Sequence, residues 1–388
     1  MLVTMHHMAH ARLGSVPPSP RETDMARDPH ARFVILCTRE PEAAPPSAVR
    51  WAAEKVCDWT TVVEIAARHR VAAFVEEACT RGAVPLPAVA RDRLDATTLR
   101  TVAHALMLDA ELTRLNEALA AREIPVIVLK GPVLARTIYP RLSARPYSDL
   151  DLVVRIEQAD AAVAVLTGLG YREVPYEAEE ARRALASTLT CGAAYHRQFV
   201  HERNGALVEV HLDPLQLGLQ PVCEAERWQR ALPVPGLPGA LMLAPEDQLV
   251  QLAVHAHKHG FERLIWVKDL DLLLRAYRTT LNQDLAVRVA RQEGVAASLW
   301  LAIRLARSLL RTPGTAALEA RLRPSPVLRF LYGLVWPTHR TYNLRGRMRR
   351  RAVQFHAAES LRGMVPSFVL FGRRRDRAQA ILSHLLQR

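Results

Sequence analysis

The stretch that decides the fold runs from Ile124 to Val154 and reads IPVIVLKGPVLARTIYPRLSARPYSDLDLVV. Its first apolar run ends at Lys130, and its second begins around the Asp-Leu-Asp triplet of Asp149 and Asp151. Successive side chains of a β-strand point to opposite faces of the sheet, so residues two apart share a face. The sequence therefore predicts that the two carboxylates converge on one side of a sheet while the leucines beside them face the core.

The charged residues and the glycine around these runs indicate chemistry on a phosphate group. Two carboxylates held close together repel each other, and a divalent cation between them relieves that repulsion. The Lys130-Gly131 turn exposes backbone N–H groups that can bind a phosphate. A metal ion and a bound phosphate together favour metal-assisted phosphoryl or nucleotidyl transfer. The alternative is that Asp149 and Asp151 form only a solvated strand end.

At these positions the chain resembles the DNA polymerase β-type nucleotidyltransferase superfamily, in particular a bacterial branch with a Leu-Lys-Gly motif and a later Arg-Pro-x-Ser-Asp-x-Asp motif. The matching residues are Leu129, Lys130, Gly131, Arg145, Pro146, Ser148, Asp149 and Asp151. The wider superfamily has Gly-Ser where this chain has Lys-Gly, and a shorter gap before its paired Asp. Both motifs in the right order favour a metal site over a solvated strand end. The resemblance implies an α+β fold, with a small mixed-sheet core flanked by N-terminal and C-terminal helical regions.

A third carboxylate is expected from a hairpin later in the chain. An Asn-Gly pair at 204–205 lies between two alternating runs, which is the strongest short signal for a β-hairpin. The second run places Glu209 and His211 on a common face. The resemblance implies that Glu209 binds the catalytic metal or takes a proton from the acceptor, and a solvent-facing Glu is the alternative. His211 is expected to orient Glu209, to contact the nucleotide or simply to pack, whereas His201 and Asp213 are predicted at the surface.

Another group of candidate residues lies on a predicted helix in the second half of the chain. His255, Lys258 and His259 fall on one face of this helix. Two His residues four apart could bind zinc, but no acidic ligand with metalloprotease spacing accompanies them. The resemblance includes a similar His-x-x-Lys-His segment followed by Trp and Asp, here Trp266 and Asp269. It implies that the two histidines and the lysine line the nucleotide or acceptor pocket.

The composition of the chain limits the classes of protein to which it can belong. The 388 residues carry a formal net charge of +13 and the pI is about 10.1, which can indicate polyanion binding. Only four of the 52 basic residues are Lys, and such an Arg bias is most simply a property of a high-GC genome. The Arg-rich stretches 340–351 and 371–377 therefore indicate nucleic-acid binding only weakly. Three lysines, Lys130, Lys258 and Lys268, lie in the two motif regions, and a compact ammonium group suits a triphosphate.

Cysteine usage and hydropathy suggest where the protein is located, and changes in composition along the chain suggest how it is divided into regions. Five Cys without a CxxC pair favour a reducing compartment, so the cytoplasm is expected. No apolar run reaches the ~18 residues that cross a bilayer, so no membrane partner is expected. The predicted parts are a disordered segment (1–46), an N-terminal helical region (47–122), the α/β core (123–239) and a C-terminal helical region (240–388). A Pro- and Gly-rich stretch, 233–239, is predicted to be a linker.

These observations predict a metal-dependent nucleotidyltransferase that moves an NMP group from an NTP, with ATP expected, to a small-molecule or peptide acceptor and releases pyrophosphate. Asp149, Asp151 and Glu209 are the predicted catalytic residues and the predicted ligands of two Mg²⁺ ions. The predicted nucleotide-binding residues are Lys130, Gly131, Arg145, Ser148, His255, Lys258 and His259. Two alternatives stay open: a nucleotidyltransferase that acts on tRNA or protein, and a non-catalytic nucleotide-binding module.

Overall fold

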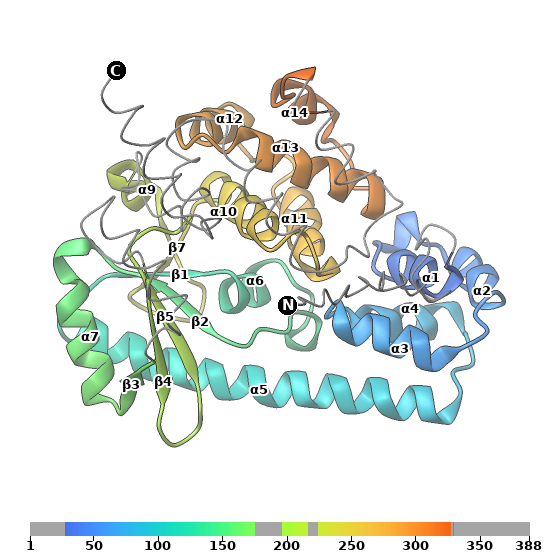
Figure 1. Cartoon of the computed structure of the whole chain (residues 1–388), viewed down its shortest axis with the longest axis horizontal. Helices are drawn as coiled ribbons and strands as arrows, with labels where there is room; N and C mark the ends of the chain where they lie inside the picture. Colours follow the sequence, from blue (N-terminus) through green and yellow to red (C-terminus); the bar gives the residue numbers. More distant parts are fainter. Residues whose placement is uncertain (1–27, 175–195, 216–223, 327–328, 330–388) are drawn as a thin grey trace, which may run out of the picture.

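The computed structural model describes residues 28–174, 196–215, 224–326 and 329. Within these ranges a mixed β-sheet lies at one end of the molecule, and helices lie above it and at the other end (Figure 1). This arrangement confirms the predicted α+β fold. No helix among the described residues is long and apolar enough to span a membrane.

The chain before the sheet is entirely helical in its described part. Its elements are α1 (Pro29–Cys37), η2 (Pro41–Ala43), α2 (Pro46–Ala53), α3 (Trp59–Arg68), α4 (Ala72–Gly82) and α5 (Ala88–Ala120). The prediction of disorder for residues 1–46 is wrong for residues 28–46, and residues 1–27 lie outside the described residues. Asp28 caps α1, and the fully buried ring of Phe33 lies 5.4 Å from that of Trp59. This segment is polar and contains Pro, so its composition did not predict α1, a short apolar helix that packs against α3.

A single long helix, α5, connects the N-terminal helices to the sheet. It contains 33 residues, and at ~1.5 Å per residue it spans about 50 Å along the lower edge of the view in Figure 1. Leu94 in its first half is buried among the N-terminal helices. Leu108, Leu112 and Leu115 in its second half are buried against the sheet. Leu108, Leu112 and Leu115 recur at four- and three-residue intervals and so lie on one face of the helix. The two halves of α5 thus pack into two different hydrophobic cores.

The sheet has seven strands in the order β3-β4-β5-β2-β1-β7-β6. Their bounds are β1 (Val126–Leu129), β2 (Leu150–Val153), β3 (Tyr171–Glu173), β4 (His196–His201), β5 (Leu207–His211), β6 (Leu232–Pro233) and β7 (Ala240–Met242). At the centre, β2 runs antiparallel to β1 and parallel to β5. The central strands are buried, and α6 (Gly131–Thr137) and α7 (Ala159–Gly168) follow β1 and β2 along the chain.

The stretch predicted as a linker, 233–239, is instead a turn within the sheet. It connects β6 to β7, and β7 pairs in parallel with β1, so that Ile127 lies opposite Leu241. Gly236 and Gly239 adopt the positive φ angles of 70° and 86° that this turn requires. Pro and Gly mark linkers and tight turns alike, and a three-residue strand is too short to show an alternating pattern. The sheet therefore extends to Met242.

The hairpin predicted around the Asn-Gly pair is confirmed. Strands β4 and β5 pair antiparallel, Gly205 has a φ of 71°, and the Asn204 side chain accepts a hydrogen bond from the backbone of Ala206. The prediction that His201 and Asp213 lie at the surface is wrong, because both are buried. The His201 ring packs 4.9 Å from that of Tyr171, and Asp213 accepts a hydrogen bond from the backbone N–H that follows two residues later.

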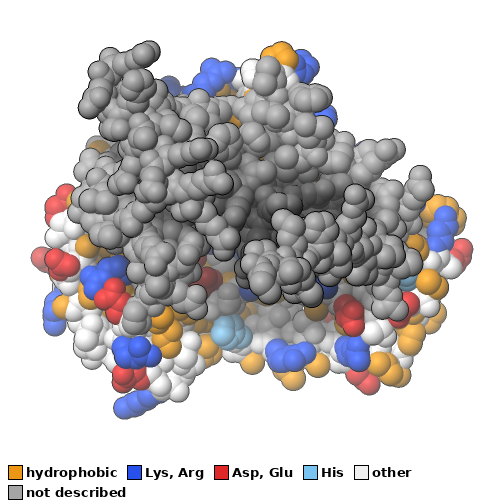
Figure 2. Space-filling model, viewed as in Figure 1, with side chains coloured by type: hydrophobic (Ala, Val, Ile, Leu, Met, Phe, Trp, Pro, Cys, Tyr) orange, Lys and Arg blue, Asp and Glu red, His pale blue; other side chains and the backbone are white. Residues whose placement is uncertain are grey.

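The chain after the sheet is helical in its described part. Its elements are α10 (Pro245–Lys258), α11 (Leu264–Ala276), α12 (Gln283–Gln292), α13 (Ala296–Leu305), the π-helical η5 (Ala306–Leu310) and α14 (Ala316–Arg321), with α9 (Glu224–Arg230) before β6. Both Arg-rich stretches, 340–351 and 371–377, lie outside the described residues. On the face drawn in Figure 2, basic and acidic side chains alternate along the lower rim of the described surface.

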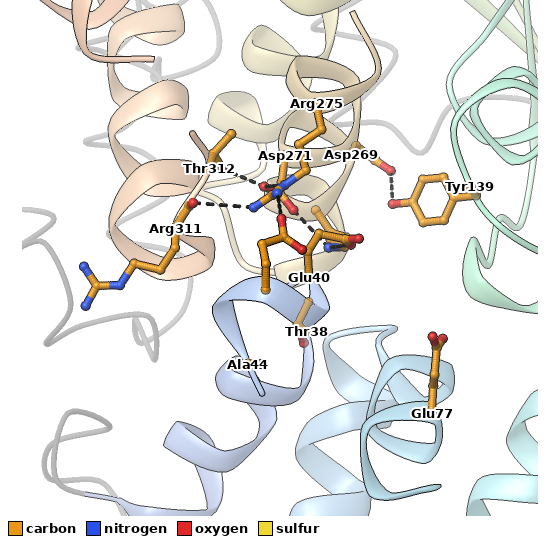
Figure 3. Close-up of polar contacts among 12 residues, drawn as sticks. Thr38, Glu40, Ala44, Glu77, Tyr139, Asp269, Asp271, Arg275, Arg311 and Thr312 are labelled. Atoms are coloured by element: carbon orange, nitrogen blue, oxygen red, sulfur yellow. Dashed lines mark hydrogen bonds and ion pairs between the residues drawn. The ribbon is translucent and has the colours of Figure 1, made fainter. Parts of the chain in front are cut away.

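The two helical regions are joined to each other as well as to the sheet. One hydrophobic core contains residues from α1 to α4 and from α10 to α14, whereas a second lies between the sheet, α5 and α7. A buried polar cluster around Asp271 of α11 reinforces the first (Figure 3). Lys268 donates to Asp271 at 2.9 Å and to Glu40, which precedes η2, at 2.6 Å. Lys268 is therefore a structural cation in this fold.

Candidate active site

The predicted carboxylates meet on the central strands of the sheet. Asp149 directly precedes β2 and Asp151 lies within it. The parallel register of β2 and β5 places Glu209 directly opposite Asp151, and the antiparallel register of β1 places Leu129 opposite Asp151 on the other side. Strand alternation in β2 and the hairpin that delivers β5 therefore bring three acidic residues to one place.

His211 joins this group by contacting two of the carboxylates. Its Nε2 atom lies 2.8 Å from Asp151 Oδ1 and 3.3 Å from Glu209 Oε2. Candidate ligand atoms of these three residues all lie within 4.8 Å of one another. Burial lowers the pKa of His211, but its hydrogen bonds to both acids raise the pKa above the ordinary value overall. Of the three predicted roles for His211, the structure favours orientation of the acidic group.

Lys130 supplies the cation of the group from the end of β1. Its Nζ atom lies 2.9 Å from Asp151 Oδ1. Burial lowers the pKa of this ammonium, yet the charges of Asp151, Asp149 and Glu209 raise it above the ordinary value, so Lys130 stays charged. Its φ of 53° lies in the left-handed region, which costs a non-glycine residue roughly 1–2 kcal/mol. Such strain concentrates at functional sites, where the surrounding structure holds it in place.

The two aspartates titrate in opposite directions. Burial and the negative charge of Asp151 raise the pKa of Asp149 to about 6, although Lys130 and Arg70 act against the increase. Burial also disfavours the charged form of Asp151, but Lys130 and His211 outweigh it and hold the pKa well below its usual range. Asp151 is therefore paired with Lys130 and His211, whereas Asp149 forms no ion pair or hydrogen bond within the described residues.

Gly131 has a steric reason to be glycine. A Cβ atom at this position would lie 2.4 Å from the Cβ of Tyr147, which is closer than any real contact. The absence of a side chain thus lets the start of α6 pack directly against the segment that leads to Asp149. Its predicted contact with phosphate stays a prediction.

Arg145 is occupied by a buried ion pair. Its Nε and Nη2 atoms donate to the two carboxylate oxygens of Asp269 at 2.6 and 2.8 Å, and the Tyr139 hydroxyl donates to the same carboxylate at 2.6 Å (Figure 3 shows the Tyr139 contact). This bidentate geometry attaches the loop before Asp149 to α11. Arg145 belongs to the Arg-Pro-x-Ser-Asp-x-Asp motif, and Asp269 follows the His-x-x-Lys-His segment. Their ion pair therefore gives both residues a structural role.

The end of α10 lies beside Lys130 of this group, and the predicted role of its residues in a nucleotide pocket stays a prediction. His255 Nδ1 is 3.5 Å from Lys130 Nζ, and burial together with the charge of Lys130 lowers the pKa of His255 well below its ordinary value. Burial lowers the pKa of Lys258 to about 8, although Asp213 and Glu209 act to raise it. His259 is exposed, and its ring lies 4.7 Å from that of His255 and 5.1 Å from that of Trp266.

Two further residues reach the group without having been predicted. Gln198 of β4 donates from Nε2 to Glu209 Oε1 at 2.7 Å and orients this acid from the neighbouring strand. Arg70, which follows α3, has Nη2 3.4 Å from the hydroxyl of the exposed Ser148. The hairpin register could have identified Gln198. Arg70 carries no local sequence signal, because only the docking of α3 on the loop brings it there.

The donor set fits a divalent cation. Mg²⁺ prefers carboxylate oxygens, and a bound cation offsets both the burial and the charge of Asp151, which together raise the pKa of Asp149. Asp149, Asp151 and Glu209 offer such oxygens, while His211 contacts two of the three residues.

A mixed sheet that carries acidic residues on adjacent central strands, with a lysine at the turn after the first strand, defines a nucleotidyltransferase. The chain belongs to the family described as uncharacterised nucleotidyltransferase, whose model matches residues 55–311, more than half of the chain. The matched segment contains every candidate site residue, from Arg70 to His259. No curated protein matches the chain.

Proposed function

We propose that this nucleotidyltransferase transfers an NMP group from an NTP, with ATP expected, to an oxygen atom of a small acceptor and releases pyrophosphate. The observation that carries the proposal is the group of three carboxylates at β2 and β5 beside a charged Lys130. A purely structural cluster would pair its charges, whereas Asp149 has no ion-pair partner within the described residues and burial, together with the charge of Asp151, raises its pKa to about 6.

The residues of the site would have different roles in the reaction. Two Mg²⁺ ions held by Asp149, Asp151 and Glu209 would stabilise the negative charge that develops on the transferred phosphoryl group and on pyrophosphate. Lys130 would bind the β- and γ-phosphates, and Lys258 would add a second cation from α10. The acceptor hydroxyl would lose its proton to the carboxylate of Glu209 or of Asp149, which would act as the general base.

The orienting contacts keep this arrangement fixed. Gln198 and His211 hold Glu209 from two sides, and His211 also holds Asp151. The ion pair between Arg145 and Asp269 fixes the loop that ends at Asp149. A preorganised acidic group loses little free energy to rearrangement when it binds a metal and a nucleotide.

The test uses Asp149→Asn and Asp151→Asn, with Asp95→Asn on the exposed surface of α5 as a matched control. Pyrophosphate release from each of the four NTPs would be measured with Mg²⁺ and the small-molecule fraction of a cell extract as the acceptor source. Because metal binding supplies several kcal/mol of charge stabilisation, we expect each site variant to lose roughly a thousandfold of the activity. Circular dichroism should show all three variants folded. Equal turnover in wild type and site variants would contradict the assignment.

A further inference from the structure

A cavity of about 360 Å³ is lined by Ser148, which directly precedes Asp149, and by no other predicted nucleotide-binding residue. Its walls come from the end of α3 and the start of α4, from the middle of α5, and from the loop that leads to Ser148. This volume is in the range that holds a small molecule and is too small for a folded polymer. Ser148 lines the cavity and immediately precedes Asp149, and the charge of Asp149 acts on Arg70 of the cavity wall.

The cavity has one partly buried cation, Arg70. Its Nη2 atom lies 3.4 Å from Ser148 Oγ, and within the described part of the chain it forms no ion pair. Burial and the charges of Arg263 and Arg145 lower its pKa to about 10, and Asp149 compensates only in part. Arg145 is already neutralised by Asp269. A guanidinium in this position is suited to an anionic group of a ligand.

The opposite wall, on α5, offers hydroxyl groups. Thr97 and Thr101 each donate a hydrogen bond to the carbonyl one turn earlier, so their oxygens can still accept. Ser143 and Ser148 add hydroxyls from the loop. The cavity thus combines two cationic groups, the partly buried Arg70 and the exposed Arg100, with several neutral polar groups, a set that suits a hydroxylated anion.

The two sides of the acidic group have different cations. Lys130 contacts Asp151 and lies near His255 of α10. Arg70 instead lies 3.4 Å from the hydroxyl of Ser148, and its charge lowers the pKa of Asp149. A triphosphate bound by Lys130 and Lys258 would therefore leave the Arg70 side of Asp149 available to the other substrate.

We propose that this cavity binds the acceptor, a small hydroxylated molecule whose phosphate or carboxylate group contacts Arg70 and whose hydroxyl reaches Asp149. The proposal rests on the nucleotidyl transfer proposed above. In the reaction the hydroxyl oxygen forms a bond to the α-phosphorus, and the bond from that phosphorus to the bridging oxygen breaks. The bond's electron pair leaves with pyrophosphate, and the hydroxyl proton passes to Asp149 or Glu209.

The first test uses inorganic phosphate as the probe of the cavity. Phosphorus NMR line broadening would report its binding to the full chain, alone and with saturating α,β-methylene-ATP and Mg²⁺. We compare Arg70→Gln with Arg68→Gln, a neighbouring arginine on the exposed side of α3. We expect wild type and Arg68→Gln to bind phosphate with the nucleotide analogue present, and Arg70→Gln to bind it at least tenfold more weakly. Phosphate binding that the analogue abolishes, or that Arg70→Gln leaves unchanged, would overturn the proposal.

The second test fills the cavity without removing a charge. Ala67 lines the cavity and is exposed, so Ala67→Phe should fold normally; Ala110→Phe, at an exposed position of α5 outside the cavity, is the control. We expect Ala67→Phe alone to lose phosphate binding at least tenfold while its affinity for the nucleotide analogue stays unchanged. Loss of nucleotide affinity in Ala67→Phe would place the nucleotide in this cavity and refute the proposal. Failure of the wild type to bind any nucleotide would refute the proposed function instead, and the phosphate experiment without nucleotide would still decide the cavity.

Discussion

Two buried lysine–aspartate pairs in this molecule have the same geometry and different surroundings. Lys268 Nζ lies 2.9 Å from Asp271 Oδ2, and Lys130 Nζ lies 2.9 Å from Asp151 Oδ1. Both residues of the first pair lie on α11, and Lys268 also contacts Glu40 in the N-terminal region, whereas the second pair lies on the sheet. A distance alone therefore does not distinguish a structural ion pair from a catalytic one.

The difference lies in the balance of charge around each pair. Asp271 also accepts hydrogen bonds from Arg275 at 2.8 Å and from Thr312 at 2.7 Å (Figure 3), while Lys268 also contacts Glu40. Arg275 also pairs with the exposed Glu42, so two cations meet three acids, of which only Asp271 is fully buried, and every one of these charges has a partner.

The cluster on the sheet is not balanced in this way. Lys130 and His211 pair with Asp151, and Arg70 and Lys258 act on the group, but Asp149 forms no ion pair within the described residues, and its pKa is raised to about 6 mainly by burial and then by the charge of Asp151. A closed cluster fixes the fold, whereas an unbalanced cluster keeps the capacity to bind a cation.

The largest expected effect is on stability, from Lys268→Met. This change leaves Asp271 and Glu40 with one cation fewer in a buried place, and loss of one member of a buried ion pair costs about 3–5 kcal/mol. Urea denaturation should show this decrease in the free energy of unfolding. Lys55→Met, where the lysine lies over the exposed Trp51 ring, should change it far less. Similar losses in both variants would show that the Asp271 cluster does not hold the helices together.

The intermediate effect is on binding, from Lys130→Ala. A charge-assisted contact to phosphate contributes roughly 1.5–3 kcal/mol, so the affinity for ATP with Mg²⁺ should fall about tenfold to a hundredfold. The affinity for AMP should change less, because AMP lacks the β- and γ-phosphates. Calorimetry with both nucleotides measures the difference, and Lys55→Ala is the control. Equal losses for ATP and AMP would place Lys130 away from these two phosphates.

The smallest effect is the pH dependence that Asp149 gives to stability. Its pKa is about 6 in the folded chain and near the ordinary 3.8 in the unfolded chain. The unfolded chain therefore releases this proton at lower pH, so stability from this group is greatest below about pH 4 and decreases as the pH rises through 6. Asp149→Asn removes the effect, and its stability relative to wild type should rise by about 2 kcal/mol between pH 4 and pH 7.

Thermal unfolding across this pH range tests the expectation. Mg²⁺ added at pH 7 should stabilise the wild type more than Asp149→Asn, because the cation replaces the proton as the partner of the carboxylate. A difference between the two proteins that does not vary with pH would contradict the unbalanced charge on which the comparison depends.

Local rules in the sequence predicted most of the acidic group. Alternation in β2 put Asp149 and Asp151 together, and the Asn-Gly turn put Glu209 and His211 on the adjacent strand. The same rules failed for β7, because three residues cannot show a period. They also missed the burial of His201, whose ring packs on Tyr171 across the register of β3 and β4.

The sequence by itself determined the composition of the acidic group, the hairpin that completes it and the α+β class, because strand alternation and turn chemistry act over a few residues. Only the tertiary structure decided which charges are paired. Arg145 and Asp269 are 124 residues apart and meet because α11 packs beside the loop. Arg70 reaches Ser148 across 78 residues in the same way. Which residues pair over such sequence separations depends on how the helices pack against each other and against the sheet, and no local sequence pattern predicts it.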